Sequence, residues 1–383
     1  MSRPIPLLIV STTLDCGGAE RFASTLLANI DRDRLQPELV LFRNKLGYAM
    51  PADVSLHTLG HRRVWNTART VARLRQLIRR QQPAIILSNI AATNVVTGMA
   101  LCGIHARPRW VARVGNSPRL HDSFLKSWGA NIVYPMADRI VGNSVGLTDE
   151  LRTRFSPLAQ RMTTLPNPTD LKALALQSTC ADSLRPRMEG PLLIAVGRLC
   201  QQKRYDLMLE AFARVRSQVS AELWICGDGP LRRQLERQIR HLKLTSSVRL
   251  LGLRRNPHAL MKQADLFLMS SDHEGSPNAL IEAQVLGIPA VTTKCPHGPE
   301  EIVIHRTTGF LTPVGNADAF ANAVLRALKT KELLSHTSAY EQVRRRFDAN
   351  RVVRQWEDLL CQQVMTTRSE PSDFHSVSQV QSP

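Results

Sequence analysis

The stretch LFLMSSDHEGSPNALIEAQVLGIP, residues 266–289, decides the fold. It opens on the apolar run Leu266–Met269, which is typical of a short strand buried in a parallel sheet. Ser276 followed by Pro277 predicts a helix start, with a hydroxyl N-cap and a proline at the first helical position, and Gly287 predicts the helix end. The chain thus passes from a strand through a polar loop into a helix, and ligand sites of α/β proteins lie at such carboxyl ends of strands.

The polar loop and the helix after it carry two acidic side chains. Free backbone N–H groups at a helix start, with the positive end of the helix dipole, suit a phosphate group. Glu274 precedes the helix and Glu282 lies about 8 Å further along its axis, so the two carboxylates can reach different parts of one extended ligand. A single glutamate is more often a surface carboxylate than a ligand, but here strand, cap, proline and glycine stop coincide.

A second polar segment follows the predicted strand at residues 192–196. Gly197 gives it a flexible backbone, and Arg198 and Lys203 supply cations. A guanidinium and an ammonium group beside a leaving nucleoside diphosphate stabilise its developing negative charge without a metal ion. Two further predicted strands end in glycine turns, at Gly227 and Gly252, which by themselves indicate only a crevice of nucleotide size.

Short β-branched runs alternate with amphipathic helical stretches along the chain, which indicates parallel sheets covered by helices. The predicted strands are residues 7–11, 38–42, 84–88, 109–114, 139–142 and 162–165 in the first half, and 192–196, 222–226, 248–251, 266–269, 290–292 and 309–311 in the second. At 383 residues the chain is about twice the length of a typical single domain. We therefore expect an α/β fold of two Rossmann-like domains, residues 1–180 and 190–345, with a linker within 170–191, a C-terminal helix at 346–365 and a disordered tail at 366–383.

The charge balance predicts an anionic partner. Lys and Arg total 50 against 32 Asp and Glu, a formal net charge of +18. Basic residues fall on helical stretches such as residues 68–80, where Val71, Leu74 and Ile78 make one apolar stripe. A solvated face, an anionic membrane surface and nucleic acid all remain open for such a helix. An aromatic content of 5% leaves few platforms for stacking single-stranded bases, and the scattered charge also disfavours nucleic acid.

The remaining composition argues against metal sites, disulfides and membrane spans. The seven cysteines are scattered singly without a CxxC pair, which is typical of buried thiols in a reducing cytoplasm. No run approaches the roughly 20 apolar residues that cross a bilayer, and residues 6–11 read as a first strand rather than part of a signal peptide. We expect a cytoplasmic protein, peripheral on the inner face of the plasma membrane.

Together these motifs resemble the retaining GT-B glycosyltransferases of family 4. The resemblance rests on Gly197-Arg198 with Lys203, the turn at residues 227–230, the strand end at Gly252, and the Glu274-x7-Glu282 pair. It extends more loosely to the first half, where residues 17–21 (GGAER) look like that family's glycine loop and residues 165–168 (LPNP) like its turn toward the linker. The resemblance implies two Rossmann-like domains facing each other across a cleft, with the C-terminal helix packing back on the first domain.

The resemblance also implies roles for single residues. Arg198 and Lys203 would contact the donor diphosphate, Glu274 would face the transferred sugar, and these three are the catalytic candidates. Glu282 would bond the nucleoside ribose. The other donor-binding candidates are Gly17, Gly18, Gly197, Gly227, Gly252, Leu253, Arg254, Gly275, Ser276, Pro277 and Asn278.

The family's mechanism retains the anomeric configuration, commonly by front-face attack in which a donor phosphate oxygen helps to deprotonate the acceptor. No dedicated general base is then needed, and the sequence offers no convincing one. Many members place a histidine in the loop that corresponds to residues 113–118, whereas here His121 follows a few residues later. Arg113, Asn116, His121 and Glu301 are the candidates for acceptor or sugar contacts.

The predicted function is transfer of a hexosyl or N-acetylhexosaminyl group from a nucleotide-diphosphate sugar, with UDP the family's commonest carrier. The acceptor would be a saccharide or a lipid-linked saccharide in the assembly of cell-surface polysaccharide, lipopolysaccharide or glycan, without a metal or other cofactor. Another retaining GT-B activity, such as a glycogen-synthase-like transfer or a sugar-phosphate synthase, shares the donor site and stays open. So do a basic nucleic-acid-binding protein and a nucleotide-sugar-binding module without turnover.

Overall fold

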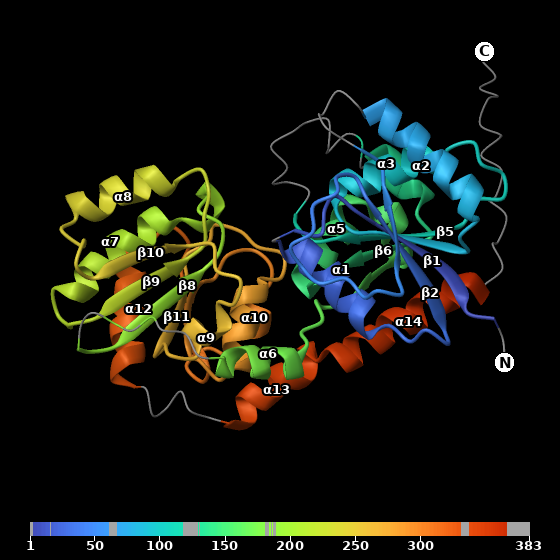
Figure 1. The fold of residues 1–383 in the computed structure, drawn as a ribbon. Helices are drawn as coiled ribbons and strands as arrows, with labels where there is room; N and C mark the ends of the chain where they lie inside the picture. The colour runs from blue at the N-terminus through green and yellow to red at the C-terminus, as the bar shows by residue number, and fades with distance from the viewer. Residues whose placement is uncertain are drawn as a thin grey trace, which may run out of the picture.

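The chain forms two α/β lobes, each built on a parallel sheet (Figure 1). The computed structural model describes residues 3–365 except 16, 61–66, 118–128, 130, 181–183, 185, 187, 188 and 331–336. The predicted tail at 366–383 and His121 lie outside the described residues. Two parallel-sheet domains confirm the predicted fold class.

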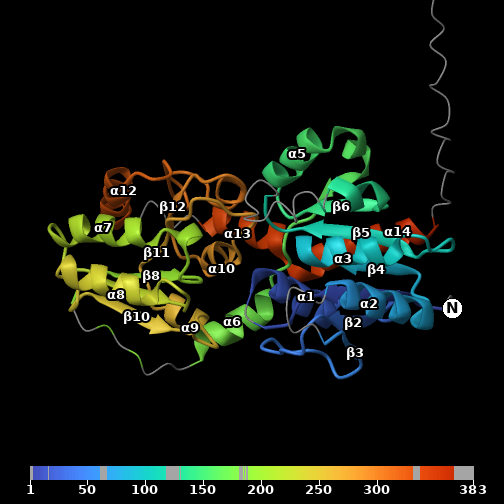
Figure 2. The same ribbon diagram turned by 90° about the horizontal axis from the view of Figure 1, so that it is seen from above.

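The first domain holds a seven-stranded sheet in the order β3-β2-β1-β4-β5-β6-β7. Its strands are β1 (Ile5–Ser11), β2 (Leu35–Leu41), β3 (Ser55–Thr58), β4 (Ile85–Ser88), β5 (Arg109–Val114), β6 (Arg139–Gly142) and β7 (Met162–Thr164). Its helices are α1 (Gly18–Asn29), α2 (Thr67–Gln81), α3 (Ala91–Leu101) and α5 (Val145–Arg154), with short 3-10 turns at Tyr134–Met136 and Ser156–Arg161. One apolar core joins the sheet to α2, α3 and α5, and another joins its opposite face to α1 (Figure 1; Figure 2 gives the view from above).

The second domain holds a six-stranded sheet in the order β10-β9-β8-β11-β12-β13, the Rossmann order. Its strands are β8 (Leu192–Val196), β9 (Glu222–Cys226), β10 (Val248–Gly252), β11 (Leu266–Met269), β12 (Ala290–Thr293) and β13 (Gly309–Thr312). One face packs on α7 (Tyr205–Arg216), α8 (Arg232–His241) and α12 (Ala317–Lys329). The other face packs on α6 (Leu171–Thr179), α9 (His258–Met261), α10 (Asn278–Val285), α11 (Pro299–Ile302) and α13 (Thr337–Phe347).

The chain crosses between the domains twice, and the two crossings lie side by side. Thr169 N donates to Phe347 O at 2.7 Å, and Ala349 N donates to Thr169 O at 2.9 Å. The stretch predicted as a linker, residues 170–191, begins with helix α6, whose Leu174 is buried in the core of the second domain. The first crossing therefore precedes Leu171.

The last helix, α14 (Ala349–Met365), returns to the first domain, as predicted (Figure 1). Its Trp356 is fully buried and meets Phe22 of α1 edge to face, with ring centroids 5.1 Å apart. An aromatic pair of this kind adds to the stabilisation that burial of the rings provides. Within the described residues, none of the helices combines the length and the apolar character that a bilayer crossing requires.

Candidate functional site

The two sheets turn the carboxyl ends of their strands toward each other, and the predicted site residues lie there. Glu274, in the loop after β11, is 6% exposed. The Lys203 ammonium group, from the 3-10 turn Gln201–Lys203 after β8, donates to Glu274 Oε1 at 2.5 Å. Two predicted catalytic residues from different loops are thus paired at one point of the interdomain face.

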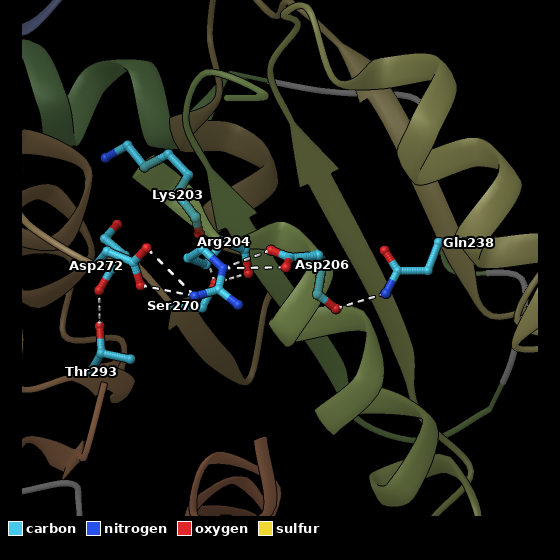
Figure 3. A network of polar contacts seen from close by, with 8 residues as sticks. Lys203, Arg204, Asp206, Gln238, Ser270, Asp272 and Thr293 are labelled. Carbon is cyan, nitrogen blue, oxygen red and sulfur yellow. Dashed lines mark hydrogen bonds and ion pairs between the residues drawn. The ribbon is translucent and has the colours of Figure 1, made fainter. Parts of the chain in front are cut away.

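A polar network behind Lys203 fixes this turn (Figure 3). Ser270 Oγ donates to the carbonyls of Lys203 and Arg204, each at 2.8 Å. Arg204 has a left-handed backbone (φ 47°), and its guanidinium reaches Asp206 at 3.1 Å and Asp272 at 3.2 Å. Hydrogen bonding to Asp206, with lesser contributions from Asp272, raises the pKa of Arg204 despite its partial burial. The Lys203 side chain extends away from Arg204 and Asp206 (Figure 3), so its ammonium group is presented to Glu274.

Arg198 is exposed, and its guanidinium makes no hydrogen bond or ion pair with the described residues. Its loop is held by backbone contact with the next loop: Gly227 has φ 147°, and a Cβ there would lie 1.9 Å from Gly197 O. Gly227 N also donates to Gly252 O at 2.8 Å. Leu253 and Arg254 lie exposed at the rim beyond Gly252. The backbone contacts therefore bring the three predicted glycine turns together and leave Arg198 available to an anion.

Glu282, on α10, is 4% exposed and its two oxygens have different partners. Arg21 of α1, in the other domain, pairs with Oε1, and His258 Nε2 lies 3.0 Å from Oε2. Burial alone would raise the pKa of Glu282, but the charge of Arg21 and the hydrogen bond to His258 outweigh it and hold the pKa below its ordinary value. The same carboxylate thus links the two domains.

A cavity of about 240 Å³ opens beside this pair, between α1, α6 and α10. Arg21, His258, Asn278 and Glu282 contribute to its wall. His258 Nδ1 lies 2.8 Å from Gln177 Oε1, so α6 orients the imidazole that meets Glu282.

The start of α10 differs in detail from the prediction. Pro277, not Ser276, is the N-cap, with φ −73° and ψ 101°, and no side chain caps the helix. The prediction was wrong by one residue because Pro277 takes the extended conformation required of the cap, so the helix begins at Asn278. Among the described residues no side-chain oxygen accepts from this first turn, and Leu280 N donates to Pro277 O at 3.0 Å, so the N–H groups of Asn278 and Ala279 are left for an anion.

The loops of the two domains touch at this helix start. Asn278 Nδ2 donates to Gly18 O at 3.3 Å, and Asn167 Nδ2 donates to Asn278 Oδ1 at 2.7 Å. A Cβ on Gly275 would lie 1.9 Å from Gly115 O, so the backbones meet where only glycine leaves room. The glycine loop at residues 17–18 therefore faces the strand-loop-helix segment from the opposite domain.

The candidates for acceptor contacts differ in how accessible they are to a ligand. Asn116 is exposed at the end of β5. Arg113 is 2% exposed and enclosed by Asn89, Asn167 and Phe22, so it has no direct path to a ligand in this conformation. Glu301 Oε1 accepts from Gly146 N at 3.1 Å, and its Oε2 pairs with Arg346 at 2.5 Å.

Several site residues have no local signal in the sequence. Arg21 lies in a motif that was noted only for its glycines, and His258 follows no pattern that distinguishes it from a core histidine. His297 Nε2 lies 2.6 Å from Glu150 Oε2 across the domain boundary. Each of these contacts joins residues far apart in the chain, and only residue covariation among homologues could have indicated them.

Comparison with known proteins places the chain in a family. The model described as "Glycosyl transferases group 1" matches residues 179–344, and that described as "Glycosyltransferase Family 4" matches residues 16–173. The chain is 26% identical over 339 residues, 83% of this chain and 87% of the relative, to N-acetylgalactosamine-N,N'-diacetylbacillosaminyl-diphospho-undecaprenol 4-alpha-N-acetylgalactosaminyltransferase of Campylobacter jejuni. An uncharacterised glycosyltransferase of Methanocaldococcus jannaschii is 27% identical over 246 residues, a match that spans 60% of this chain and 60% of that protein.

Solved structures share the whole architecture. HepE of Anabaena, in complex with UDP and glucose, has a TM-score of 0.76 and 21% identity, and the match covers 94% of this chain and 100% of HepE. Sucrose-phosphate synthase of Thermosynechococcus elongatus has a TM-score of 0.79 and 16% identity, with 94% and 98% covered. At these identities the likeness concerns the fold. With two domains that match the two family models in order, the chain belongs to the family 4 glycosyltransferases and has the GT-B fold.

Proposed function

We propose that this glycosyltransferase moves a hexosyl or N-acetylhexosaminyl group from a UDP-sugar to a saccharide or lipid-linked saccharide, with retention at the anomeric carbon. The observation that carries the proposal is the meeting of Lys203 with Glu274, beside an Arg198 and a helix start that have no side-chain partner among the described residues. Cations and free N–H groups suit a diphosphate, and a buried carboxylate suits the sugar. The UDP and glucose bound by the structural neighbour HepE support this choice of donor.

In this proposal the bond between the anomeric carbon and the distal phosphate oxygen breaks while the acceptor oxygen bonds to the same face of that carbon. The acceptor proton passes to the departing phosphate oxygen. Arg198 and Lys203 stabilise the negative charge that develops on the diphosphate, and Glu274 orients the sugar and offsets positive charge at its anomeric carbon. With two cations in these places we propose that no metal ion is required, which predicts full turnover in EDTA.

Glu282 would bind the ribose of the nucleotide. A ribose hydroxyl donates to a carboxylate oxygen, but Arg21 and His258 already engage both oxygens of Glu282. Each carboxylate oxygen can accept more than one hydrogen bond, so the ribose hydroxyl would share Oε1 with Arg21, while His258 keeps the carboxylate oriented. Leu253 and Arg254 would line the base.

The acceptor proposal draws on the Campylobacter jejuni relative, whose name describes transfer to an undecaprenol-diphosphate-linked saccharide. A lipopolysaccharide core glycosyltransferase of Rhizobium meliloti is also similar, at 29% identity over 136 residues. We propose an acceptor of this class, in cell-surface polysaccharide or lipopolysaccharide assembly. Asn116 and the neighbouring first-domain loops would meet it.

A lipid-linked acceptor favours a protein bound peripherally at the cytoplasmic face of the membrane. The solvent side of α2 carries Arg69, Arg79 and Arg80, and a groove between α2 and α3 is lined by Val71 and Met99 with other apolar and basic groups. Exposed arginines above an apolar groove suit anionic headgroups. The net positive charge was compatible with a solvated face, an anionic membrane surface or nucleic acid. We therefore propose that α2 binds an anionic membrane surface.

The donor proposal is tested by turnover with radiolabelled nucleotide sugars, after nucleoside diphosphates have been ranked by thermal shift. Glu274→Gln and Arg198→Gln should each lower kcat by about 100-fold or more, and Arg198→Gln, at an exposed position, should leave the melting temperature nearly unchanged. Glu300→Gln, which removes a half-exposed carboxylate near the same cleft, is the matched control and should keep full activity. Near-normal turnover in both site variants would overturn the site assignment.

The membrane proposal is tested by flotation with vesicles that contain phosphatidylglycerol at physiological salt. The triple variant Arg69→Gln, Arg79→Gln, Arg80→Gln should lose binding. Arg233→Gln, Arg237→Gln, Arg240→Gln on α8 removes the same charge from exposed positions of the other domain and should bind normally. Failure of the wild-type protein to float, or equal loss in both variants, contradicts the proposal.

A further inference from the structure

Arg113, at the end of β5, is a buried cation that forms no ion pair with a carboxylate among the described residues. Its Nη1 donates to Asn89 Oδ1 at 2.9 Å and to Asn89 O at 3.2 Å, and its Nη2 donates to Asn167 Oδ1 at 2.5 Å. The guanidinium carbon lies 4.1 Å from the ring centroid of Phe22. Its Nε has no hydrogen-bond partner among the described residues. The charge is thus surrounded by two amides and an aromatic face.

The two amide side chains also hydrogen-bond to backbone and side-chain groups of both domains. Asn89 Nδ2 donates to Ala19 O, in the first turn of α1, at 2.5 Å. Asn167 Nδ2 donates to Asn278 Oδ1 at 2.7 Å and to Ser276 O at 3.3 Å. Since Asn278 Nδ2 donates in turn to Gly18 O, Arg113 stands at the centre of a closed polar circuit. That circuit fixes the distance between the glycine loop of one domain and the start of α10 in the other.

The positive charge of Arg113 is present at neutral pH. Burial lowers its pKa to about 9, and the Glu20 carboxylate on α1, which does not touch it, offsets only part of that effect. A buried ion without a counter-ion is unfavourable. The amides of Asn89 and Asn167 would separate Arg113 from an anion bound between the glycine loop and α10. Because these surroundings are buried, they would screen the attraction between the two charges only weakly.

We propose that Arg113 is a positioning residue of the donor site: it sets the spacing of the two backbone segments that receive the diphosphate, and its incompletely offset charge favours an anion between them. The inference rests on the proposed function, because it takes the diphosphate to bind at residues 17–18 and 275–278. Arg113 acts through Asn89 and Asn167 and touches neither sugar nor phosphate. Its role therefore differs from the direct ligand contact that the sequence suggested.

The test measures nucleotide affinity by calorimetry in the full-length protein, with UDP, GDP and ADP screened first and the tightest binder used as the probe. Arg113→Gln should weaken binding by about 5- to 150-fold, the usual range for coupling between sites. Arg113→Lys keeps the charge but replaces the planar fork, whose two nitrogens reach the two amides, with a single ammonium nitrogen. It should recover much of the affinity and little of kcat.

Two further variants separate this role from general stability. Arg109→Gln removes an arginine from the other end of the same strand, where Arg109 pairs with Asp138. It should lower the melting temperature without changing nucleotide affinity. Asn89→Asp keeps the oxygen that accepts from Arg113 and gives it a counter-ion, and it also removes the donor to Ala19 O. Both changes should weaken nucleotide binding while the protein without ligand stays folded.

The outcomes distinguish the two proposals. If the wild-type protein binds none of the three nucleotides, the proposed function fails and the inference fails with it. If the wild type binds but Arg113→Gln and Asn89→Asp bind equally well, only the inference is overturned. If Arg113→Gln does not fold, Asn89→Asp decides, and unchanged affinity in that variant overturns the charge argument.

Discussion

At the residue scale, Glu282 joins a structural role to its proposed part in ribose binding. Its ion pair with Arg21 is partly buried and spans the two domains. We predict that Glu282→Gln lowers the free energy of unfolding by about 1–3 kcal/mol at pH 7, measured by urea denaturation. Glu341→Gln, which removes a more exposed glutamate that pairs within its own helix, should change it by less than about 0.5 kcal/mol.

The same carboxylate predicts a pH dependence. The pKa of Glu282 in the folded protein lies below its ordinary value of 4.5, so the unfolded chain binds a proton more readily than the folded one. The stabilisation is therefore complete above about pH 4.5 and is lost as the pH falls through the folded-state pKa. Melting temperatures recorded from pH 7 down to pH 3.5 should fall less steeply in Glu282→Gln than in the wild type, and parallel curves would contradict the assignment.

Gly275 is the residue where backbone contact between the domains leaves least space. A methyl group there would clash with Gly115 O, so Gly275→Ala should hold the domains slightly apart. Because a misplacement of about 1 Å can lower a rate by about 100-fold, we predict a loss of that order in kcat with little change in melting temperature. Gly315→Ala, at an open turn with no atom within 4 Å of the added methyl, should keep its kcat, although the φ of 76° strains an alanine there and lowers the melting temperature.

The sequence indicated Glu274, Lys203 and Arg198 because each follows an apolar strand in a recognisable order. It did not indicate Asn89 or Asn167 as partners of Arg113, since both hydrogen bonds join segments far apart in the chain. An arginine at the end of a buried strand has the same local pattern whether it faces a cleft or is enclosed. Arg113 is enclosed because α1 packs over it and places the Phe22 ring against its guanidinium group.

At the element scale, twelve strands follow the predicted positions closely because parallel strands buried on both faces are continuous apolar runs. The strand β3 (Ser55–Thr58) was missed. It is a four-residue edge strand with half-exposed Leu56 and His57 between polar residues, so its pattern is that of a loop. Its position depends on pairing with β2, both through the backbone and through His57, whose Nε2 lies 2.7 Å from Glu38 Oε2 of that strand.

The helix α14 should contribute to the stability of the first domain although it is the last element of the chain. Trp356 is fully buried against that domain's core. We predict that Trp356→Ala lowers the free energy of unfolding by about 3–5 kcal/mol, measured by urea denaturation followed at a first-domain probe. Met365→Ala, at the exposed end of the same helix, is the control and should leave the stability unchanged.

At the scale of the whole molecule, side-chain contacts across the boundary hold the domains together. Arg21 with Glu282 and Glu150 with His297 lie on α1 and α5, on different parts of the interface. We predict that the double variant Arg21→Gln, Glu150→Gln has a larger radius of gyration by small-angle X-ray scattering, because fewer contacts oppose opening. Added UDP should reduce it more than in the wild type.

The double variant Arg32→Gln, Glu341→Gln makes the same charge changes in contacts that stay within one domain. Its scattering should match the wild type. Equal radii for all three proteins would show that these contacts do not govern closure. The number of domains could be predicted from the chain length and the strand periodicity. The domain surfaces that contact each other could not, because they depend on pairs of residues far apart in the sequence that follow no periodic pattern.

The return of α14 to the first domain has a consequence for synthesis on the ribosome. The second domain is one continuous segment, so its core is complete once α13 has left the exit tunnel. The first domain, although it is translated earlier, lacks Trp356 and its neighbours until the final helix emerges. Nascent chains that have emerged from the tunnel only as far as about residue 348 should therefore carry a finished second domain and an unfinished first one, the reverse of the order in which they were made.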